Sequence, residues 1–140
     1  MEYKRFGDVI ALRLEVGERV VESIAEVCRR EDVRFASISG LGATNDATVG
    51  VLDLASKQFV GKRCQGTYEI GSLTGNATRR DGEPYLHLHI VFGNPTTGEC
   101  YCGHLTDAVI SATAEIVIQV AKGEVGRRLD ESVGLNLWSM

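Results

Sequence analysis

All three histidines of this 140-residue chain lie within residues 85–105. His87 and His89 are two positions apart in a run rich in strand-forming side chains, so a strand would point both imidazoles to the same face. A second strand-like stretch follows residues 93–99 and carries His104. Three neutral imidazoles on one sheet face suit zinc, nickel, cobalt or ferrous iron, and they leave a position for water or substrate. The spacing predicts an open divalent-metal site, for which we expect zinc.

The register of the two stretches decides whether the three imidazoles meet. Antiparallel pairing places His104 opposite His87 in one register and opposite His89 in a register shifted by two residues, whereas a shift by one sends it to the other face. Cys102 alternates with His104 and could complete a closed, structural zinc site as a thiolate. The alternative interpretation is a packed hairpin whose histidines bind no metal.

The rest of the chain must supply the sheet that positions these residues. Apolar residues recur at helical spacing over residues 18–30, which predicts the one main helix, and Cys28 lies in its apolar stripe as a core residue. Residues 105–112 are expected to form a short helix or an irregular connection. Glycines at positions 40 and 42 indicate a bend or bulge, because a dinucleotide loop would need a third glycine and a following helix. The predicted strands are residues 9–16, 33–39, 47–54, 67–73 and 114–121.

Composition limits the classes of function. The length suits one domain, residues 1–140, and 44% hydrophobic with 24% charged residues is ordinary for a globular protein. The formal net charge of −4 gives no positive field toward DNA or anionic lipid. The chain shows no apolar run long enough to span a membrane and no signal peptide, so we expect a cytoplasmic protein with four reduced cysteines.

Several motifs, in order, resemble the plants-and-prokaryotes-conserved (PPC) domain over nearly the whole chain. The resemblance implies an α+β fold, a largely antiparallel β-sheet with one main helix and short flanking helices, assembled as a homotrimer. It also implies a metal on His87, His89 and His104, as in similar prokaryotic members. Where the family often has Gly-Gly-His, this chain has Cys102-Gly103-His104. The matching segments are Leu12–Glu18, Ser37–Ala43, Tyr68–Ile70, Leu73–Asn76, His87–His89 and Gly103–Leu105.

Two functions follow as hypotheses. The first is a cytoplasmic homotrimer that binds a divalent metal and acts on or binds a small molecule; in a hydrolytic version, metal-activated water would be the nucleophile and Glu69 or Glu115 the base. The alternative is a DNA-associated or transcription-related module for oligomerisation and protein interaction. The chain has no Arg-Gly-Arg-Pro hook, and its basic doublets outside the helix are Arg79-Arg80 and Arg127-Arg128. The DNA function is thus implied by resemblance and not by charge.

Overall fold

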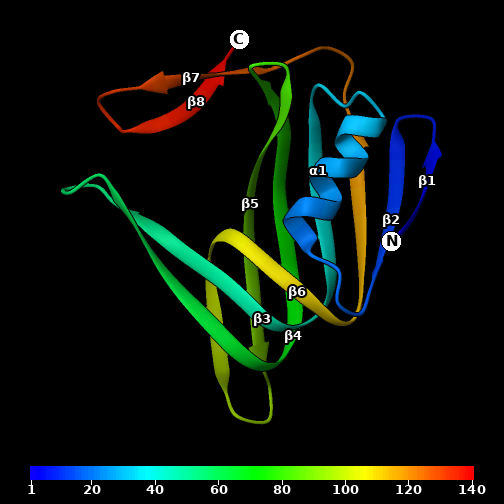
Figure 1. Cartoon of the computed structure of the whole chain (residues 1–140), viewed down its shortest axis with the longest axis vertical. Coiled ribbons are helices and arrows are strands. Elements are labelled where there is room, and N and C mark those ends of the chain that lie inside the picture. Colours follow the sequence, from blue (N-terminus) through cyan, green and yellow to red (C-terminus); the bar gives the residue numbers. More distant parts are fainter.

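The structure, a computed structural model, describes residues 1–140 and consists of eight strands and one helix (Figure 1). Six strands form an antiparallel sheet in the order β1-β2-β6-β3-β4-β5, and β6 also pairs with β5. β7 and β8 form a separate hairpin. The elements are β1 Glu2–Phe6, β2 Val9–Glu15, α1 Val20–Arg30, β3 Ala36–Asp53, β4 Gln58–Arg80, β5 Glu83–Asn94, β6 Glu99–Val120, β7 Gly126–Asp130 and β8 Leu135–Ser139.

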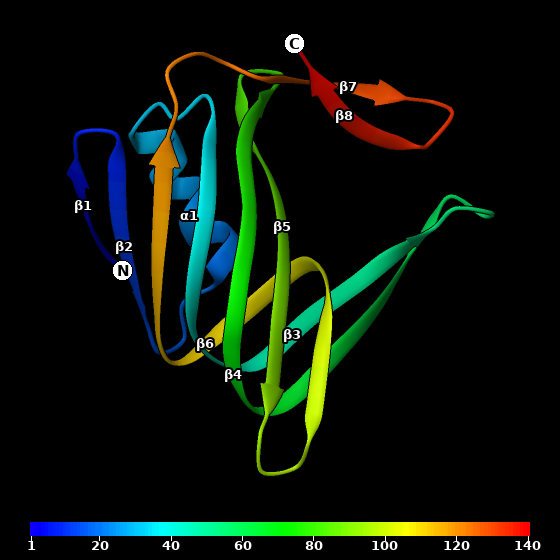
Figure 2. The same ribbon diagram turned by 180° about the vertical axis from the view of Figure 1, so that it is seen from behind.

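The sheet has one face covered by α1 and one face without a helix, as the two opposite views show (Figures 1 and 2). In β2, Ile10, Leu12 and Leu14 are buried, while the residues between them are exposed. This period of two confirms the predicted strand and directs its apolar side chains into the core. In β5, Leu88 and Ile90 are buried in the same way. The histidines that alternate with them therefore lie on the face opposite α1.

The helix buries the stripe that its sequence predicts. Val20, Ile24, Val27 and Cys28 are fully buried, and the helix packs on β5 and β6. Burial raises the pKa of the Cys28 thiol to about 12, because a thiolate loses its hydration in an apolar site. Cys28 is a core residue, as expected. No helix of the chain is both long enough and apolar enough to cross a membrane.

The expectation of an α+β fold with short flanking helices is wrong. Strands hold 70% of the residues and the single helix 8%, so the chain is mostly β. Residues 105–112, expected to be a short helix or connection, lie inside β6. Leu105, Ala108 and Ile110 are the buried residues there, and β6 shifts its register against β3 in this region. Because of this irregularity, the buried residues Leu105 and Ala108 are three positions apart instead of two, and a spacing of three is typical of a helix.

Long strands also replace several short ones. Residues 33–39 and 47–54 were expected as separate strands, but residues 36–53 form the single strand β3. Its ladder with β4 shifts between Gly40 and Gly42 and again between Thr44 and Asp46. These irregularities bend one strand instead of ending it, which confirms the predicted bulge at the glycines. β4 likewise runs past Asn76, where the predicted strand was expected to close.

A candidate metal centre beside a cationic cleft

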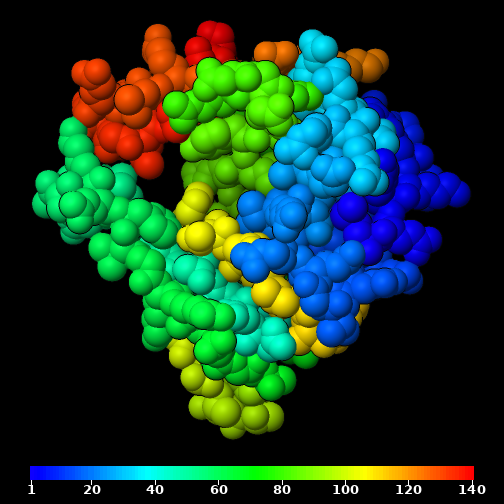
Figure 3. All heavy atoms as spheres, viewed as in Figure 1, coloured from blue at the N-terminus to red at the C-terminus, as the bar shows by residue number.

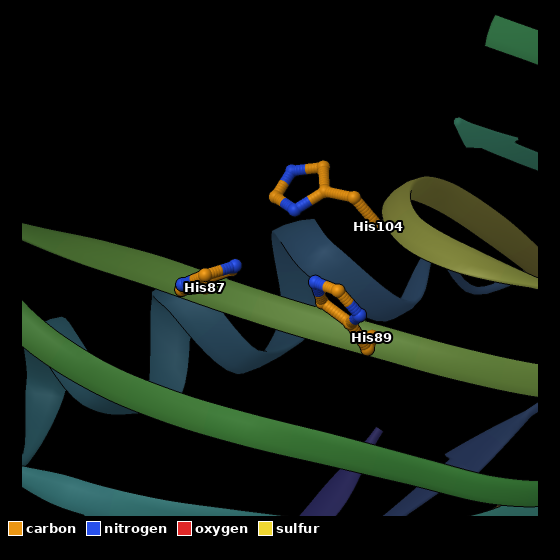
Figure 4. A group of neighbouring side chains, drawn as sticks. All are labelled: His87, His89 and His104. Carbon is orange, nitrogen blue, oxygen red and sulfur yellow. The ribbon is translucent and has the colours of Figure 1, made fainter. Parts of the chain in front are cut away.

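The three histidines come together where β5 pairs with β6. Gly93 lies opposite Cys100, and His89 lies opposite His104, which is one of the two registers that would place the histidines on one face. His87 lies two positions from His89 on the same strand. Figure 4 shows the three imidazoles facing one another above the sheet, two from β5 and one from β6. The structure thus brings together all three residues that the sequence selected.

The imidazoles are close enough to share one ion. Ring centroids are 5.2 Å apart for His87 and His89, 5.3 Å for His87 and His104, and 5.7 Å for His89 and His104. One nitrogen of each ring lies within 4.8 Å of the other two. Nitrogens bound to tetrahedral zinc at roughly 2.0–2.1 Å are about 3.4 Å apart. Small side-chain rotations would therefore bring the three nitrogens to zinc, so this donor set fits the ion.

The surroundings favour neutral imidazoles. His87 and His104 are half-buried and His89 is exposed. Burial, followed by the neighbouring imidazoles His104 and His89, lowers the pKa of His87. Burial also lowers the pKa of His104, with His89 as the second cause. Because a metal binds the unprotonated ring nitrogen, these shifts extend metal binding toward lower pH.

Two glycines allow the strands at this site to approach closely. A Cβ on Gly75 would lie 2.0 Å from the carbonyl oxygen of His87, and a Cβ on Gly103 would lie 2.8 Å from the carbonyl oxygen of Gly50. Both contacts are shorter than any normal packing distance. A larger residue at either position would move the backbone that carries His87 or His104.

The other candidates from the sequence lie outside the histidine cluster. Cys102 is exposed and lines the same cleft as the histidines, but its sulfur is not among the clustered ligand atoms. Glu115 lines a different pocket, opposite Arg13 on β2, and Glu69 pairs with Gly93 at an exposed position. Neither glutamate lines the histidine cleft. The structure therefore places no carboxylate base beside the imidazoles.

A large cleft opens beside the cluster. Its volume is about 1060 Å³, and it lies between the histidines, the far part of the β3–β4 hairpin and the β7–β8 hairpin. In the space-filling view a hollow lies between the far part of the β3–β4 hairpin, the β7–β8 hairpin and β5 (Figure 3). Cavities of roughly 300–1,000 Å³ hold small molecules, so this cleft has room for a ligand beside the imidazoles.

Arg127 also lines this cleft, a position that the sequence did not predict. Its guanidinium donates hydrogen bonds to Thr78 Oγ1 at 2.9 Å and Asn76 Oδ1 at 2.7 Å, and it lies 4.9 Å from the ring centre of Tyr85. Trp138, the single tryptophan of the chain, lines the same cleft. The Arg127-Arg128 doublet was the available signal, and in the sequence it indicates only a possible contact to DNA. Its position depends on the β7–β8 hairpin, which the sequence did not predict.

The family model of the Plants and Prokaryotes Conserved (PCC) domain matches residues 1–122. The chain belongs to this family. The match confirms the resemblance seen in the sequence, since PCC and PPC denote the same domain. No curated protein matches this PCC-domain chain.

Solved structures resemble the PCC-domain chain over almost its whole length. A metal-containing protein from Archaeoglobus fulgidus is 34% identical, with a TM-score of 0.88 over 99% of this chain and 97% of that one. A plant- and prokaryote-conserved protein from Pyrococcus horikoshii is 28% identical, with a TM-score of 0.86 over 99% and 94%. A proposed DNA-binding protein from Bacteroides thetaiotaomicron is 26% identical, with a TM-score of 0.94 over 99% and 96%.

Proposed function

We propose that this protein binds zinc through His87, His89 and His104 and that the metal serves a small-molecule ligand held in the adjoining cleft. The observation that carries the proposal is the convergence of one nitrogen from each imidazole within 4.8 Å. The 34% identical metal-containing protein from Archaeoglobus fulgidus supports it. Bound zinc would act as a Lewis acid or activate water. The imidazoles would hold the ion, and the cleft walls would orient the ligand.

The proposal includes assembly as a cytoplasmic homotrimer. All four cysteines are free, and a reducing compartment would keep them so. Phe6, Leu41 and Val117, which line a separate pocket, are 43–57% exposed, and exposed apolar patches mark contact surfaces. Light scattering should give three times the 15.2 kDa mass of the chain. A mass of one chain would contradict the trimer without affecting the metal site.

Measuring the amount of zinc per chain tests the proposed metal site. Protein purified without an affinity tag should contain close to one zinc per chain by plasma mass spectrometry. A variant with His87, His89 and His104 changed to alanine should contain none and should keep its circular dichroism spectrum. Wild-type protein that is empty and fails to take up added zinc would leave the alternative of a packed hairpin.

A second function, DNA association, is supported by the 26% identical proposed DNA-binding protein. The charges of this chain oppose it. Arg79 pairs with Asp32 at 2.6 Å and Arg80 with Asp81 at 3.4 Å, so one basic doublet is neutralised within the protein. Binding to DNA should therefore be weak. Tight binding that weakens steeply with salt in a gel-shift assay would favour this function over the first.

A further inference from the structure

The cleft beside the histidines contains no acidic side chain. The chain has 19 aspartates and glutamates and a net charge of −4, yet none of them lines this cavity. Lys62 and Arg127 line it together with the three imidazoles. A cleft lined by cations within an acidic protein attracts anions. The charged residues of the cleft therefore favour a negatively charged ligand, whether or not a metal is bound.

Arg127 is held in place without an anionic partner. Its Nε donates to Thr78 Oγ1 at 2.9 Å, its Nη2 to Asn76 Oδ1 at 2.7 Å and its Nη1 to the Asn136 carbonyl oxygen at 3.0 Å. All three acceptors are neutral. A guanidinium has five N–H donors, so one remains on each terminal nitrogen. Two such donors match the two oxygens of a carboxylate.

The lack of an ion pair distinguishes Arg127 from most arginines of the chain. Every other arginine except Arg128 lies within 4.0 Å of a carboxylate oxygen, and the arginines in these pairs are residues 5, 13, 19, 29, 30, 34, 63, 79 and 80. Arg128 is exposed to solvent, whereas Arg127 is half-buried. Burial lowers the pKa of Arg127, as expected for a cation that has lost water without gaining an anion. A bound anion would compensate that charge.

Arg127 lies next to the metal candidates. Its partner Asn76 pairs with His87 across β4 and β5. Tyr85, whose ring it covers, lies two residues before His87 on the same strand, which corresponds to roughly 7 Å. One small molecule can therefore contact both the guanidinium and the imidazole cluster.

The remaining walls are apolar. Val51, Phe59 and Val60 line the cleft from the β3–β4 hairpin, and Leu137 and Trp138 line it from β8. These five side chains are 39–66% exposed. Burying such surface against a ligand is favourable by about 25 cal/mol per Å². The cleft thus has a cationic end at Arg127 and an apolar wall along the two hairpins.

We propose that this cleft binds a small organic carboxylate with an apolar side chain, whose carboxylate pairs with Arg127. A second oxygen on the ligand contacts the metal held by the histidines, a part of the inference that rests on the proposed function. The apolar side chain packs between the β3–β4 and β7–β8 hairpins.

Mandelate is the probe, because it carries a carboxylate, a neighbouring hydroxyl and a phenyl ring. Mandelamide has the same shape without the negative charge, and lactate lacks the ring. Calorimetry measures each compound against wild-type protein, Arg127→Gln and Arg128→Gln, with and without zinc. Arg128→Gln is the matched control, since Arg128 is the neighbouring exposed arginine and does not line the cleft.

Wild-type protein should prefer mandelate to mandelamide, and Arg127→Gln should reduce that preference by about 10- to 100-fold. Arg128→Gln should leave it unchanged. Lactate should bind at least roughly tenfold more weakly than mandelate, because it has no ring to pack against the apolar wall. Equal preferences in wild-type protein and Arg127→Gln would overturn the proposal. The wild-type comparison of acid and amide remains valid even if Arg127→Gln loosens the β7–β8 hairpin.

The measurements without zinc separate this inference from the proposed metal function. Binding that needs Arg127 but not zinc supports the carboxylate site and refutes a role for the metal in it. Binding that needs zinc but not Arg127 refutes the carboxylate site alone. Absence of binding below about 10 mM in every condition overturns the inference, and an oligomeric protein with that result would indicate that another copy of the chain fills the cleft.

Discussion

The substitution Gly75→Ala tests how closely the strands at the histidine cluster must approach. Gly75 lies on β4 opposite Leu88 of β5. An added Cβ would lie 2.0 Å from the carbonyl oxygen of His87 and 2.9 Å from the Cα of Leu88. Both atoms belong to the backbone and cannot rotate away. The two strands would have to separate by about 1 Å at the residue that carries the imidazole.

The expected loss of stability follows from this overlap. Overpacking of a tight site costs about 2 kcal/mol, and weakening two ladder hydrogen bonds costs about 2 kcal/mol more. Gly75→Ala should therefore lower the free energy of unfolding by about 4 kcal/mol, a large part of the 5–15 kcal/mol typical of a domain. Because His87 moves with the backbone, zinc affinity should also fall about tenfold or more.

Gly71→Ala is the matched control on the same strand. Its Cβ would meet only the Val91 carbonyl oxygen, at 4.0 Å, so its free energy of unfolding should change by less than about 1 kcal/mol. Urea unfolding at equal protein concentrations and competitive zinc titration measure the two effects. If Gly75→Ala is as stable as Gly71→Ala and binds zinc equally well, the claim that β4 and β5 must approach closely at Gly75 is wrong.

Three further outcomes are expected. His104→Ala should weaken zinc binding about 100- to 1000-fold in a competition titration, which is roughly a quarter of the 10–16 kcal/mol of a four-ligand zinc site. Cys102→Ala should leave zinc binding unchanged. Equal losses in the two variants would contradict the histidine cluster. In metal-free protein, His87 and His104 should titrate below their ordinary pKa of 6.5 in an NMR titration. Their contribution to stability is then present above pH 6.5 and lost as the pH falls through the folded-state pKa values; titration above 6.5 would reverse this sign. At about pH 8, Cys100 and Cys102 should react rapidly with a thiol reagent, whereas Cys28, with its pKa raised to about 12, should react only after unfolding.

Side-chain periodicity predicted the regular parts of the fold and failed where strands are irregular. The β2 strand and the helix were predicted because their apolar residues follow periods of two and of about 3.6. Residues 105–112 were mistaken for a helix or connection because a register shift spaces their buried residues unevenly. The β7–β8 hairpin was not predicted because most of its side chains are exposed and alternate little. Bulges and surface hairpins leave a weak pattern in a single sequence.

The site was predictable to the extent that it is local in the chain. His87 and His89 share a face because they are two apart on one strand, and only the register was needed to add His104. Arg127 reaches the site from β7, and it follows His87 by about 40 residues in the sequence. Its hydrogen bonds to Asn76 and Thr78 depend on how a separate hairpin packs against β4. No spacing rule connects such residues. The sequence therefore predicted the histidine wall of the cleft but not the wall formed by the β7–β8 hairpin.

X-ray absorption at the zinc edge, on protein loaded with one zinc per chain, tests the central claim most directly. The proposed site, His87, His89 and His104, predicts three imidazole nitrogens at about 2.0–2.1 Å and one further oxygen ligand. The triple alanine variant, treated in the same way, should show none of the imidazole scattering. A sulfur shell at about 2.3 Å, or a zinc ion without imidazole ligands, would contradict the account.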